Sequence, residues 1–284
     1  MKSDLHIHSS HSDGSDTIKQ LVEVISNNNL DIVALTDHDT VDGINDFRSQ
    51  LPQEIKFIPA VELTCKANDI KCHLLGYNID PENSKLKSLI IKGKGLRRQK
   101  LETRIKYLKD VWKIELTEEE LNWLYTRTTV VKTHFANILV KRGLAKDNLS
   151  AMKKYLDGCK TGNTRFDGLE AISVIKEAGG IVIWAHPLGG EGETHLSKEE
   201  FIPKLKKMIS YGIQGIECYY SRYNMEEIKF LVKIAKENNI LISGGSDYHG
   251  RNKDIPIGRL NCENIFIDSE KLSILEGCFN YFNC

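Results

Sequence analysis

The chain has 284 residues, of which 40% are hydrophobic and 27% charged, and its formal net charge is zero. This length can bury a full core, and this composition is typical of a globular protein. No apolar stretch approaches the roughly 20 residues that span a bilayer, and no basic-then-apolar signal precedes Asp4 and His6. The seven cysteines are scattered without a CxxC pair, which is typical of reduced thiols. We therefore expect a cytoplasmic enzyme that has no membrane partner.

Short β-rich segments alternate with helical patterns along most of the chain. Strands are expected at 3–7, 31–36, 56–62, 72–77, 181–185, 213–218 and 240–244, with a further short one at 264–267. Helical spacing of apolar residues occurs at 18–25, at 169–175 after Asp167, at 223–238 and in the tail at 270–282. This alternation implies parallel strands joined by right-handed crossovers. About seven such units, with one or two irregular members, favour a barrel over a flat sheet.

Between residues 85 and 165 the alternation stops. Helices are expected there at 85–111, 117–125, 133–143 and 148–157. We therefore expect residues 1–84 and 166–284 to form the barrel, and 85–165 to be an inserted helical subdomain that overhangs the active site. The insertion has 20 Lys and Arg against 8 Asp and Glu, an excess of 12 positive charges that the rest of the chain balances. Such a segment is either an ordinary solvated surface or a cap that attracts phosphate groups.

Nine potential metal ligands lie at or just beyond the ends of the expected strands. They are His6, His8, Asp13, His38, Glu62, His73, His186, Asp247 and His249. Residues two apart in a strand point to the same face, so His6 with His8 and Asp247 with His249 form natural chelating pairs. A lone histidine is usually a core or surface residue, but side chains at strand ends converge at one face of a barrel. Imidazole and carboxylate ligands without cysteine suit Zn, Mn or Fe, so we expect a site for several ions.

The motifs that carry these ligands resemble those of the PHP (polymerase and histidinol phosphatase) superfamily. They are HxH at 6–8 with Asp13, TDHD at 36–39, Glu62 followed by His73, AHP at 185–187 and SDxH at 246–249, and they cover nearly all of the chain in the right order. The resemblance implies an α/β fold, a distorted (β/α)7 TIM-like barrel, which holds two or three divalent ions (Mn²⁺, Zn²⁺ or Fe²⁺) as cofactors.

The resemblance also divides the ligands into three groups. These are His6, His8, Glu62 and Asp247; Glu62, His73 and His186; and Asp13, His38 and His249. Glu62 would bridge two cations, since a carboxylate can span the usual two-metal separation. Asp37, Asp39 and His11 are candidates to orient the ligating imidazoles, with local turn capping as the alternative.

A motif in the insertion points to one branch of the superfamily. Lys132, His134, Phe135 and Ala136, followed by Leu139, Val140 and Gly143, resemble an RxHFAxxLVxxG stretch of nucleoside 3′,5′-bisphosphate phosphatases and 5′-to-3′ exoribonucleases. In that branch the basic residue and the histidine face the substrate phosphate. This chain has lysine where arginine is usual, and a lysine offers a point charge without a bidentate fork. An ordinary helix N-terminus is the alternative for both residues.

Two residues after the strand at 213–218 are further candidates for substrate binding. Tyr220 is expected to stack on a base and Arg222 to meet a phosphate, and a packing role is the alternative for the tyrosine.

The resemblance implies a hydrolase acting on phosphoric ester bonds. It would cleave phosphate monoesters or diesters of nucleotides by attack of a metal-bound hydroxide, with His38, His249 and Asp247 as catalytic candidates. The expected substrate is a nucleoside 3′,5′-bisphosphate such as pAp, a mononucleotide or a short 5′-phosphorylated oligonucleotide. The alternatives are a phosphatase of histidinol phosphate or another small molecule, a metal-dependent amidohydrolase, and a non-catalytic PHP module that binds a partner. No obligate protein partner is expected.

Overall fold

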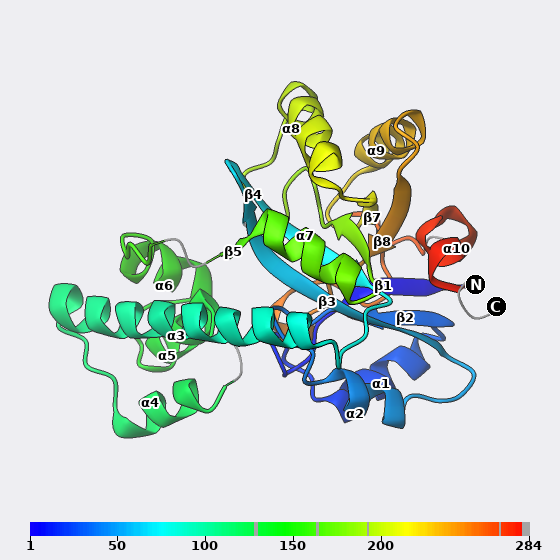
Figure 1. Ribbon diagram of the computed structural model, residues 1–284. Helices are drawn as coiled ribbons and strands as arrows, with labels where there is room; N and C mark the ends of the chain where they lie inside the picture. The colour runs from blue at the N-terminus through cyan, green and yellow to red at the C-terminus, as the bar shows by residue number, and fades with distance from the viewer. Residues whose placement is uncertain (128–129, 163–164, 192, 267, 280–284) are drawn as a thin grey trace. The chain divides into compact units, whose positions relative to one another are not determined.

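The computed structural model describes residues 1–127, 130–162, 165–191, 193–266 and 268–279 (Figure 1). The chain divides into two compact units. Unit 1 comprises Met1–Leu89 and Phe166–Cys284, and unit 2 comprises Ile90–Arg165. The long helix α3, Ser84–Trp112, begins in unit 1 and continues into unit 2, so the division falls a few residues inside this helix.

Unit 1 is an α/β barrel. Its strands are β1 (Ser3–Ile7), β2 (Ile32–Leu35), β3 (Lys56–Ala67), β4 (Ile70–Tyr77), β5 (Phe166–Asp167), β6 (Ile181–Trp184), β7 (Gly215–Tyr220) and β8 (Leu241–Gly245). The hydrogen-bonded order is β1-β2-β3-β4-β6-β7-β8, and β5 pairs with β3. A bridge between Ile7 and Tyr248 joins the two ends of this order. The nearly closed, seven-stranded barrel confirms the predicted fold class.

One strand breaks the parallel order that the alternation predicts. β4 runs antiparallel to both of its neighbours, β3 and β6. A two-residue turn joins β3 to β4, and Asn68 in this turn has a φ of 52°. Asparagine tolerates this left-handed conformation, and so short a connection can only produce a hairpin. No strand is described at 264–266, and residue 267 of that expected strand lies outside the described residues.

Helices cover the barrel strands. They are α1 (Ile18–Asn27), α2 (Ile44–Gln50), α7 (Gly168–Glu177), α8 (Lys198–Tyr211), α9 (Met225–Glu237) and α10 (Ile274–Phe279). Leu21 and Ile25 of α1 pack with Val33 and Leu35 of β2 in one buried cluster. Asp167 caps the N-terminus of α7 by accepting hydrogen bonds from two backbone N–H groups. The residues expected to be helical beyond 279 lie outside the described part of the chain.

A close approach of two strands shapes the carboxyl-terminal end of the barrel. A Cβ atom on Gly245 would lie 2.2 Å from the Cβ of His6, so only glycine lets β8 pass this near to β1. Beyond β8, the Asp247 N–H donates a 2.9 Å hydrogen bond to the carbonyl of His6. The sequence on both sides of Gly245 therefore brings the ligands of the first and last strands together.

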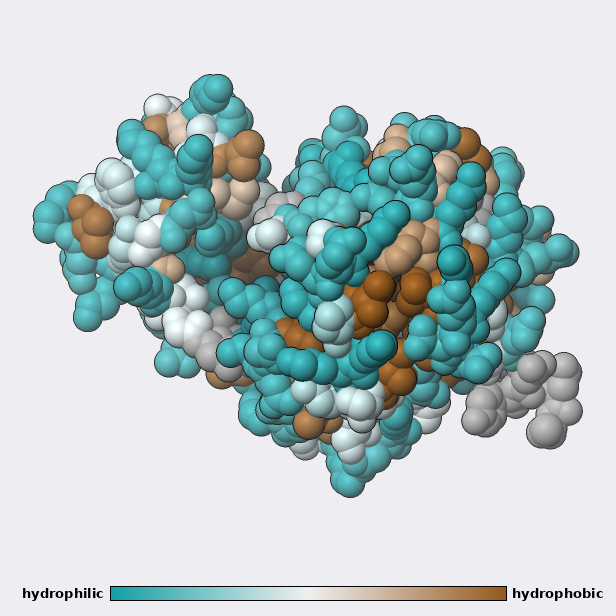
Figure 2. All heavy atoms as spheres, turned by 90° about the horizontal axis from the view of Figure 1, so that it is seen from above, coloured by the Kyte–Doolittle hydropathy of each residue, from teal (hydrophilic) through white to brown (hydrophobic). Residues whose placement is uncertain are grey.

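Unit 2 is a small helical body with its own core. It contains most of α3 together with α4 (Glu118–Tyr125), α5 (Lys132–Lys141) and α6 (Asn148–Tyr155). Leu101, Leu108, Leu124, Phe135 and Leu139 are among its buried residues. On the face drawn in Figure 2, hydrophilic side chains predominate over both units, and hydrophobic ones gather in a limited area of unit 1. Within the described residues, no helix combines the length and the apolarity needed to cross a membrane.

Candidate metal centre

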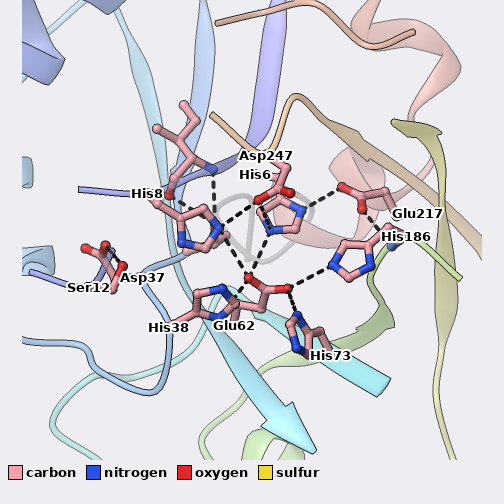
Figure 3. A network of polar contacts seen from close by, with 12 residues as sticks. His6, His8, Ser12, Asp37, His38, Glu62, His73, His186, Glu217 and Asp247 are labelled. Atoms are coloured by element: carbon pink, nitrogen blue, oxygen red, sulfur yellow. Dashed lines mark hydrogen bonds and ion pairs between the residues drawn. The ribbon is translucent and has the colours of Figure 1, made fainter. Parts of the chain in front are cut away.

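Glu62 of β3 lies at the centre of the predicted ligand set (Figure 3). Its Oε2 atom is 3.1–3.2 Å from one ring nitrogen each of His6, His8 and His38. Its Oε1 atom is 2.9 Å from His73 Nδ1 and 3.3 Å from His186 Nε2. One buried carboxylate therefore touches imidazoles from five different places in the sequence, with each of its oxygens facing a separate group of them.

The remaining three predicted ligands complete the cluster. Asp247 Oδ1 lies 3.3 Å from His8 Nε2 and 3.4 Å from His249 Nδ1. His249 Nε2 lies 3.1 Å from Asp13 Oδ1. All nine residues predicted from the sequence are thus brought together at one end of the barrel, and all nine belong to unit 1.

Three sets of ligand atoms are close enough to hold an ion each. They are His6, His8, Glu62 and Asp247; His8, Asp13, His38 and His249; and His38, Glu62 and His73. The first set is the expected one. The other two differ from expectation. The group of Glu62 and His73 contains His38 where His186 was expected, and the group of Asp13, His38 and His249 also contains His8. Glu62 is shared by two of the sets, and His186 still contacts its Oε1 atom.

The donor set fits divalent metal ions. His6, His8 and Glu62 are fully buried, yet among the described residues no hydrogen bond reaches His6 Nε2, His8 Nε2 or Glu62 Oε2. Unsatisfied buried polar atoms are costly, and these atoms converge instead of pointing apart. A divalent cation among them would satisfy their lone pairs, and imidazole with carboxylate is the donor combination of Zn, Mn and Fe sites.

The charges of the centre shift the pKa of most of its groups. Burial disfavours the charged forms, yet nearby cationic groups hold the pKa of all three carboxyl groups well below the ordinary value. Against burial, neighbouring carboxylates raise the pKa of His6 well above its usual range, that of His8 to about 9 and that of His186 to about 10. Burial prevails at His38 and His249 and lowers their pKa. The ionised carboxylates need positive charge beside them, which metal ions supply.

Two carboxylates that the sequence reasoning missed orient the ligating imidazoles. Glu217 is fully buried; its Oε1 pairs with His6 Nδ1 at 2.9 Å, and its Oε2 accepts the backbone N–H of His186 at 2.8 Å. Glu193 Oε2 lies 3.4 Å from His186 Nδ1. A carboxylate that accepts the N–H of one ring nitrogen fixes the tautomer of the imidazole, so that the other nitrogen keeps its lone pair for a metal. The signal available in the sequence was a single glutamate within the apolar run of β7.

Tyr220 and Lys253 hold the outer oxygen of Asp247. Tyr220 donates its hydroxyl to Asp247 Oδ2 at 3.1 Å, and Lys253 Nζ lies 2.6 Å from the same atom. Tyr220 is fully buried. The observed contact of Tyr220 is thus with a proposed metal ligand, and its expected stacking on a base stays a prediction. Lys253 was not predicted as a site residue.

Backbone irregularities aim these side chains into the centre. The pairing of β7 with β8 shifts register between Glu217 and Tyr219, so both Glu217 and Tyr220 reach the cluster although simple alternation separates them. His186 and Asp247 have positive φ values of 30° and 60°. Left-handed backbone is strained for residues other than glycine, and such strain gathers at functional sites.

The candidates for orienting ligands make hydrogen bonds to the loops and strands around the centre. Asp37 accepts hydrogen bonds from the hydroxyls of Ser9 and Ser12, and Asp39 accepts one from the backbone N–H of Thr64. The backbone N–H of His11 donates to Ser9 Oγ. The contacts of Asp37 and Asp39 join segments far apart in the sequence and so are not local turn caps, and a role in orienting ligands stays a prediction.

The expected substrate contacts lie partly in unit 2. Lys132 Nζ is paired with Asp157 Oδ1 at 2.7 Å, and His134 is buried at the start of α5, where its Nδ1 accepts the backbone N–H of Val131. Arg222, in unit 1, is exposed and pairs with Glu191 at 3.1 Å. Contact of these three side chains with a substrate stays a prediction.

Comparisons with known proteins agree with this geometry. The family model described as the PHP domain matches residues 4–164, more than half of the chain. The 3′,5′-nucleoside bisphosphate phosphatase of Chromobacterium violaceum is 26% identical over 269 residues, 89% of this chain and 92% of that protein. The 5′-3′ exoribonuclease Rnm of Escherichia coli K12 is 28% identical over 266 residues, 90% and 88% of the respective chains. A solved structure of a proposed metal-dependent phosphoesterase from Bifidobacterium adolescentis matches with a TM-score of 0.80. The match covers 98% of this chain and 95% of that chain, and at 24% sequence identity it supports the fold alone.

Proposed function

The chain belongs to the PHP domain family and is a phosphoester hydrolase, and we propose that its substrates are phosphate esters of nucleotides. The proposed substrate is a nucleoside 3′,5′-bisphosphate, a mononucleotide or a short 5′-phosphorylated oligonucleotide. Two curated relatives support this class, since one is a phosphatase of nucleoside bisphosphates and the other an exoribonuclease. The excess of basic residues in the 85–165 segment also favours a substrate rich in phosphate.

The observation that carries the chemistry is the arrangement around Glu62. Its two carboxylate oxygens face different imidazoles, which supports a bridging role between two divalent ions. We propose the nine residues as ligands of two or three ions of Mn²⁺, Zn²⁺ or Fe²⁺. When bound, such ions polarise phosphoryl oxygens and lower the pKa of water, which provides the nucleophile for phosphoester hydrolysis.

The protein side chains hold and orient the reacting groups. Glu217 fixes the ring of His6 so that Nε2 faces Glu62, and Asp247 presents Oδ1 to the same region. Among the catalytic candidates, His38 and His249 have lowered pKa values because they are buried. A neutral imidazole is the form that ligates a metal, so this direction favours a ligand role for both over the donation of a proton to the leaving oxygen.

A phosphate-release screen tests the substrate class. Protein loaded with Mn²⁺ is assayed against pAp, a 5′-mononucleotide, a 3′-mononucleotide, a 5′-phosphorylated trinucleotide and histidinol phosphate. Glu62→Gln serves as the inactive control, because it leaves fewer negative charges to hold the ions. We expect turnover of at least one nucleotide and none of histidinol phosphate. Turnover of non-nucleotide phosphates alone would refute the substrate class, and bound metal without any turnover would favour the non-catalytic alternative.

A further inference from the structure

Lys253 places an ammonium group inside the metal centre. Its side chain is 22% exposed, and its Nζ lies 2.6 Å from Oδ2 of Asp247, on the side of that carboxylate away from His6 and His8. An ammonium carries three N–H donors. Among the described residues Asp247 is its one hydrogen-bond partner, so two donors remain for another acceptor.

The charges of the centre indicate what that acceptor is. Asp13, Glu62 and Asp247 contribute three negative charges, and Glu217 and Glu193 beside His6 and His186 add two more. Two divalent cations together with Lys253 balance these five charges, and a third cation leaves positive charge in excess. A fixed cation beside such ions is repelled, and it also weakens the hold of Asp247 on a metal. The placement is favourable when an anion occupies the same space, because the anion then interacts with the ammonium and with the metals together.

We propose that Lys253 is a further catalytic residue, which binds a non-bridging oxygen of the substrate phosphoryl group. This inference rests on the proposed phosphoesterase function and deepens it. Asp247 holds the ammonium in position through Oδ2, and the two remaining N–H groups donate to the phosphoryl oxygen. Negative charge that develops on this oxygen during hydrolysis is stabilised by a donor that is already in place.

A purely structural role for Lys253 makes a different prediction. In that case Lys253 would act like Tyr220, which donates to the same Asp247 oxygen and has no further donor to offer. Removing either residue would then release Asp247 and weaken metal binding, with no separate effect on phosphate. The two roles therefore differ in which ligand, the metal or the phosphate, is lost.

The experiment compares four variants of the full chain: Lys253→Met, Lys253→Arg, Tyr220→Phe and Arg251→Met. Arg251 is exposed and two residues from Lys253, so its variant makes the same change in net charge outside the centre. Equilibrium dialysis measures the affinity for Mn²⁺, and calorimetry on the Mn²⁺-saturated protein measures the Kd for inorganic phosphate. Phosphate binding needs no turnover, so this test is independent of the substrate screen.

We expect Lys253→Met to keep its affinity for Mn²⁺ and to raise the Kd for phosphate about tenfold or more, as the loss of a charged hydrogen bond implies. Lys253→Arg should recover part of the phosphate affinity. Tyr220→Phe should bind Mn²⁺ less tightly but, once saturated, bind phosphate like the wild type, and Arg251→Met should change neither affinity. An unchanged phosphate Kd in Lys253→Met, or a loss of Mn²⁺ equal to that in Tyr220→Phe, would overturn the proposal.

Discussion

Glu217 is the residue on which the orientation of two proposed metal ligands, His6 and His186, depends. It accepts the ring N–H of His6 through one oxygen and the backbone N–H of His186 through the other. Glu217→Gln replaces one of these acceptors by an NH₂ donor, which would face an N–H group or force His6 into the tautomer that cannot ligate through Nε2. We expect this variant to bind Mn²⁺ about 10 to 100 times more weakly, as equilibrium dialysis would measure.

The control for this variant is Glu237→Gln, near the C-terminus of α9, where the side chain is exposed. It should bind Mn²⁺ like the wild type. Circular dichroism should give the same spectrum for both variants, since Gln and Glu have the same shape. Wild-type metal affinity in Glu217→Gln would mean that the His6 ring is held by its surroundings without this carboxylate.

The clustering of the nine proposed ligands was predictable from the sequence, and the residues that support them were not. His6, His8 and Asp247 stand out because charged or ionisable side chains are rare at the ends of apolar strands. Glu217 and Lys253 carry no such spacing signal. A shift in strand register turns Glu217 inward, and a loop beyond β8 brings Lys253 back to Asp247, so both depend on irregular backbone that periodicity does not encode.

At the level of elements, α3 places an arginine in the core of unit 2, with its guanidinium carbon 6.0 Å from the centre of the Phe135 ring. Arg104 lies between Leu101 and Leu108 on the inner side of the helix and is 3% exposed. Within the described residues its Nε and Nη1 atoms have no hydrogen-bond partner, and burial lowers its pKa to about 10. A buried charge whose donors are only partly satisfied is destabilising, and replacing it by an apolar side chain of similar length removes this cost.

We therefore expect Arg104→Met to stabilise unit 2 by about 1 kcal/mol. Urea unfolding followed by the fluorescence of Trp112 and Trp123, in a Trp184→Phe background, measures this unit. The matched comparison is Arg142→Met, which loses a two-pronged contact with Glu120 and a hydrogen bond to the Glu115 carbonyl. It should be destabilising by about 1 kcal/mol. A loss of stability in Arg104→Met as large as that in Arg142→Met would show that Arg104 has an essential partner.

The same Arg142 contact makes unit 2 sensitive to acid. Burial opposes ionisation of Glu120, but hydrogen bonds from Arg142 and Thr117 outweigh it and lower the pKa of this carboxyl group. A group with a lowered folded-state pKa contributes stability above its unfolded-state pKa, and this contribution is lost as the pH falls through the lowered value. Since the pair is partly exposed, we expect a contribution of about 1 kcal/mol at neutral pH.

Urea unfolding of Glu120→Gln between pH 3 and pH 7 checks this linkage. The variant should be less stable than the wild type at pH 7, and the difference should shrink as the pH falls below the ordinary pKa of glutamic acid. Glu119→Gln, in the same turn of α4 but exposed, is the control and should show no such trend. A difference that does not change with pH would mean that the charge of Glu120 is not what stabilises the contact.

Element type was easier to predict than element direction. Strand and helix segments follow from the period of their apolar residues, but the antiparallel course of β4 follows from a two-residue turn at Asn68. The helices α2 and α8 were not anticipated. α2 is only seven residues long, too short for a clear periodic signal. α8 has apolar residues at helical spacing, Phe201, Leu205 and Met208, but Pro203 between them argues against a helix.

At the scale of the whole molecule, the proposed metal ligands tie together the first and last parts of the chain. They come from β1, β3, β4 and the segments after β1, β2, β6 and β8, and all of them lie in unit 1. Each unit has its own buried cluster. An ion that binds only the folded form stabilises the unit that supplies its ligands, by about 2.7 kcal/mol at a free concentration 100 times the Kd.

Hydrogen exchange with and without a chelator tests this difference between the units. We expect removal of the metal to increase exchange in peptides from β1, β3 and the segment after β8, because their buried ligands then lose the ion that satisfies them. Peptides from α5 and α6 should exchange at the same rate in both conditions, since unit 2 supplies none of the proposed ligands. Glu62→Gln, which lacks a full charge at the shared carboxylate, should exchange like the chelated wild type even with Mn²⁺ present. Equal changes in both units would mean that the metal centre controls the stability of the entire chain, and no change in either would mean that the nine side chains bind no ion under these conditions.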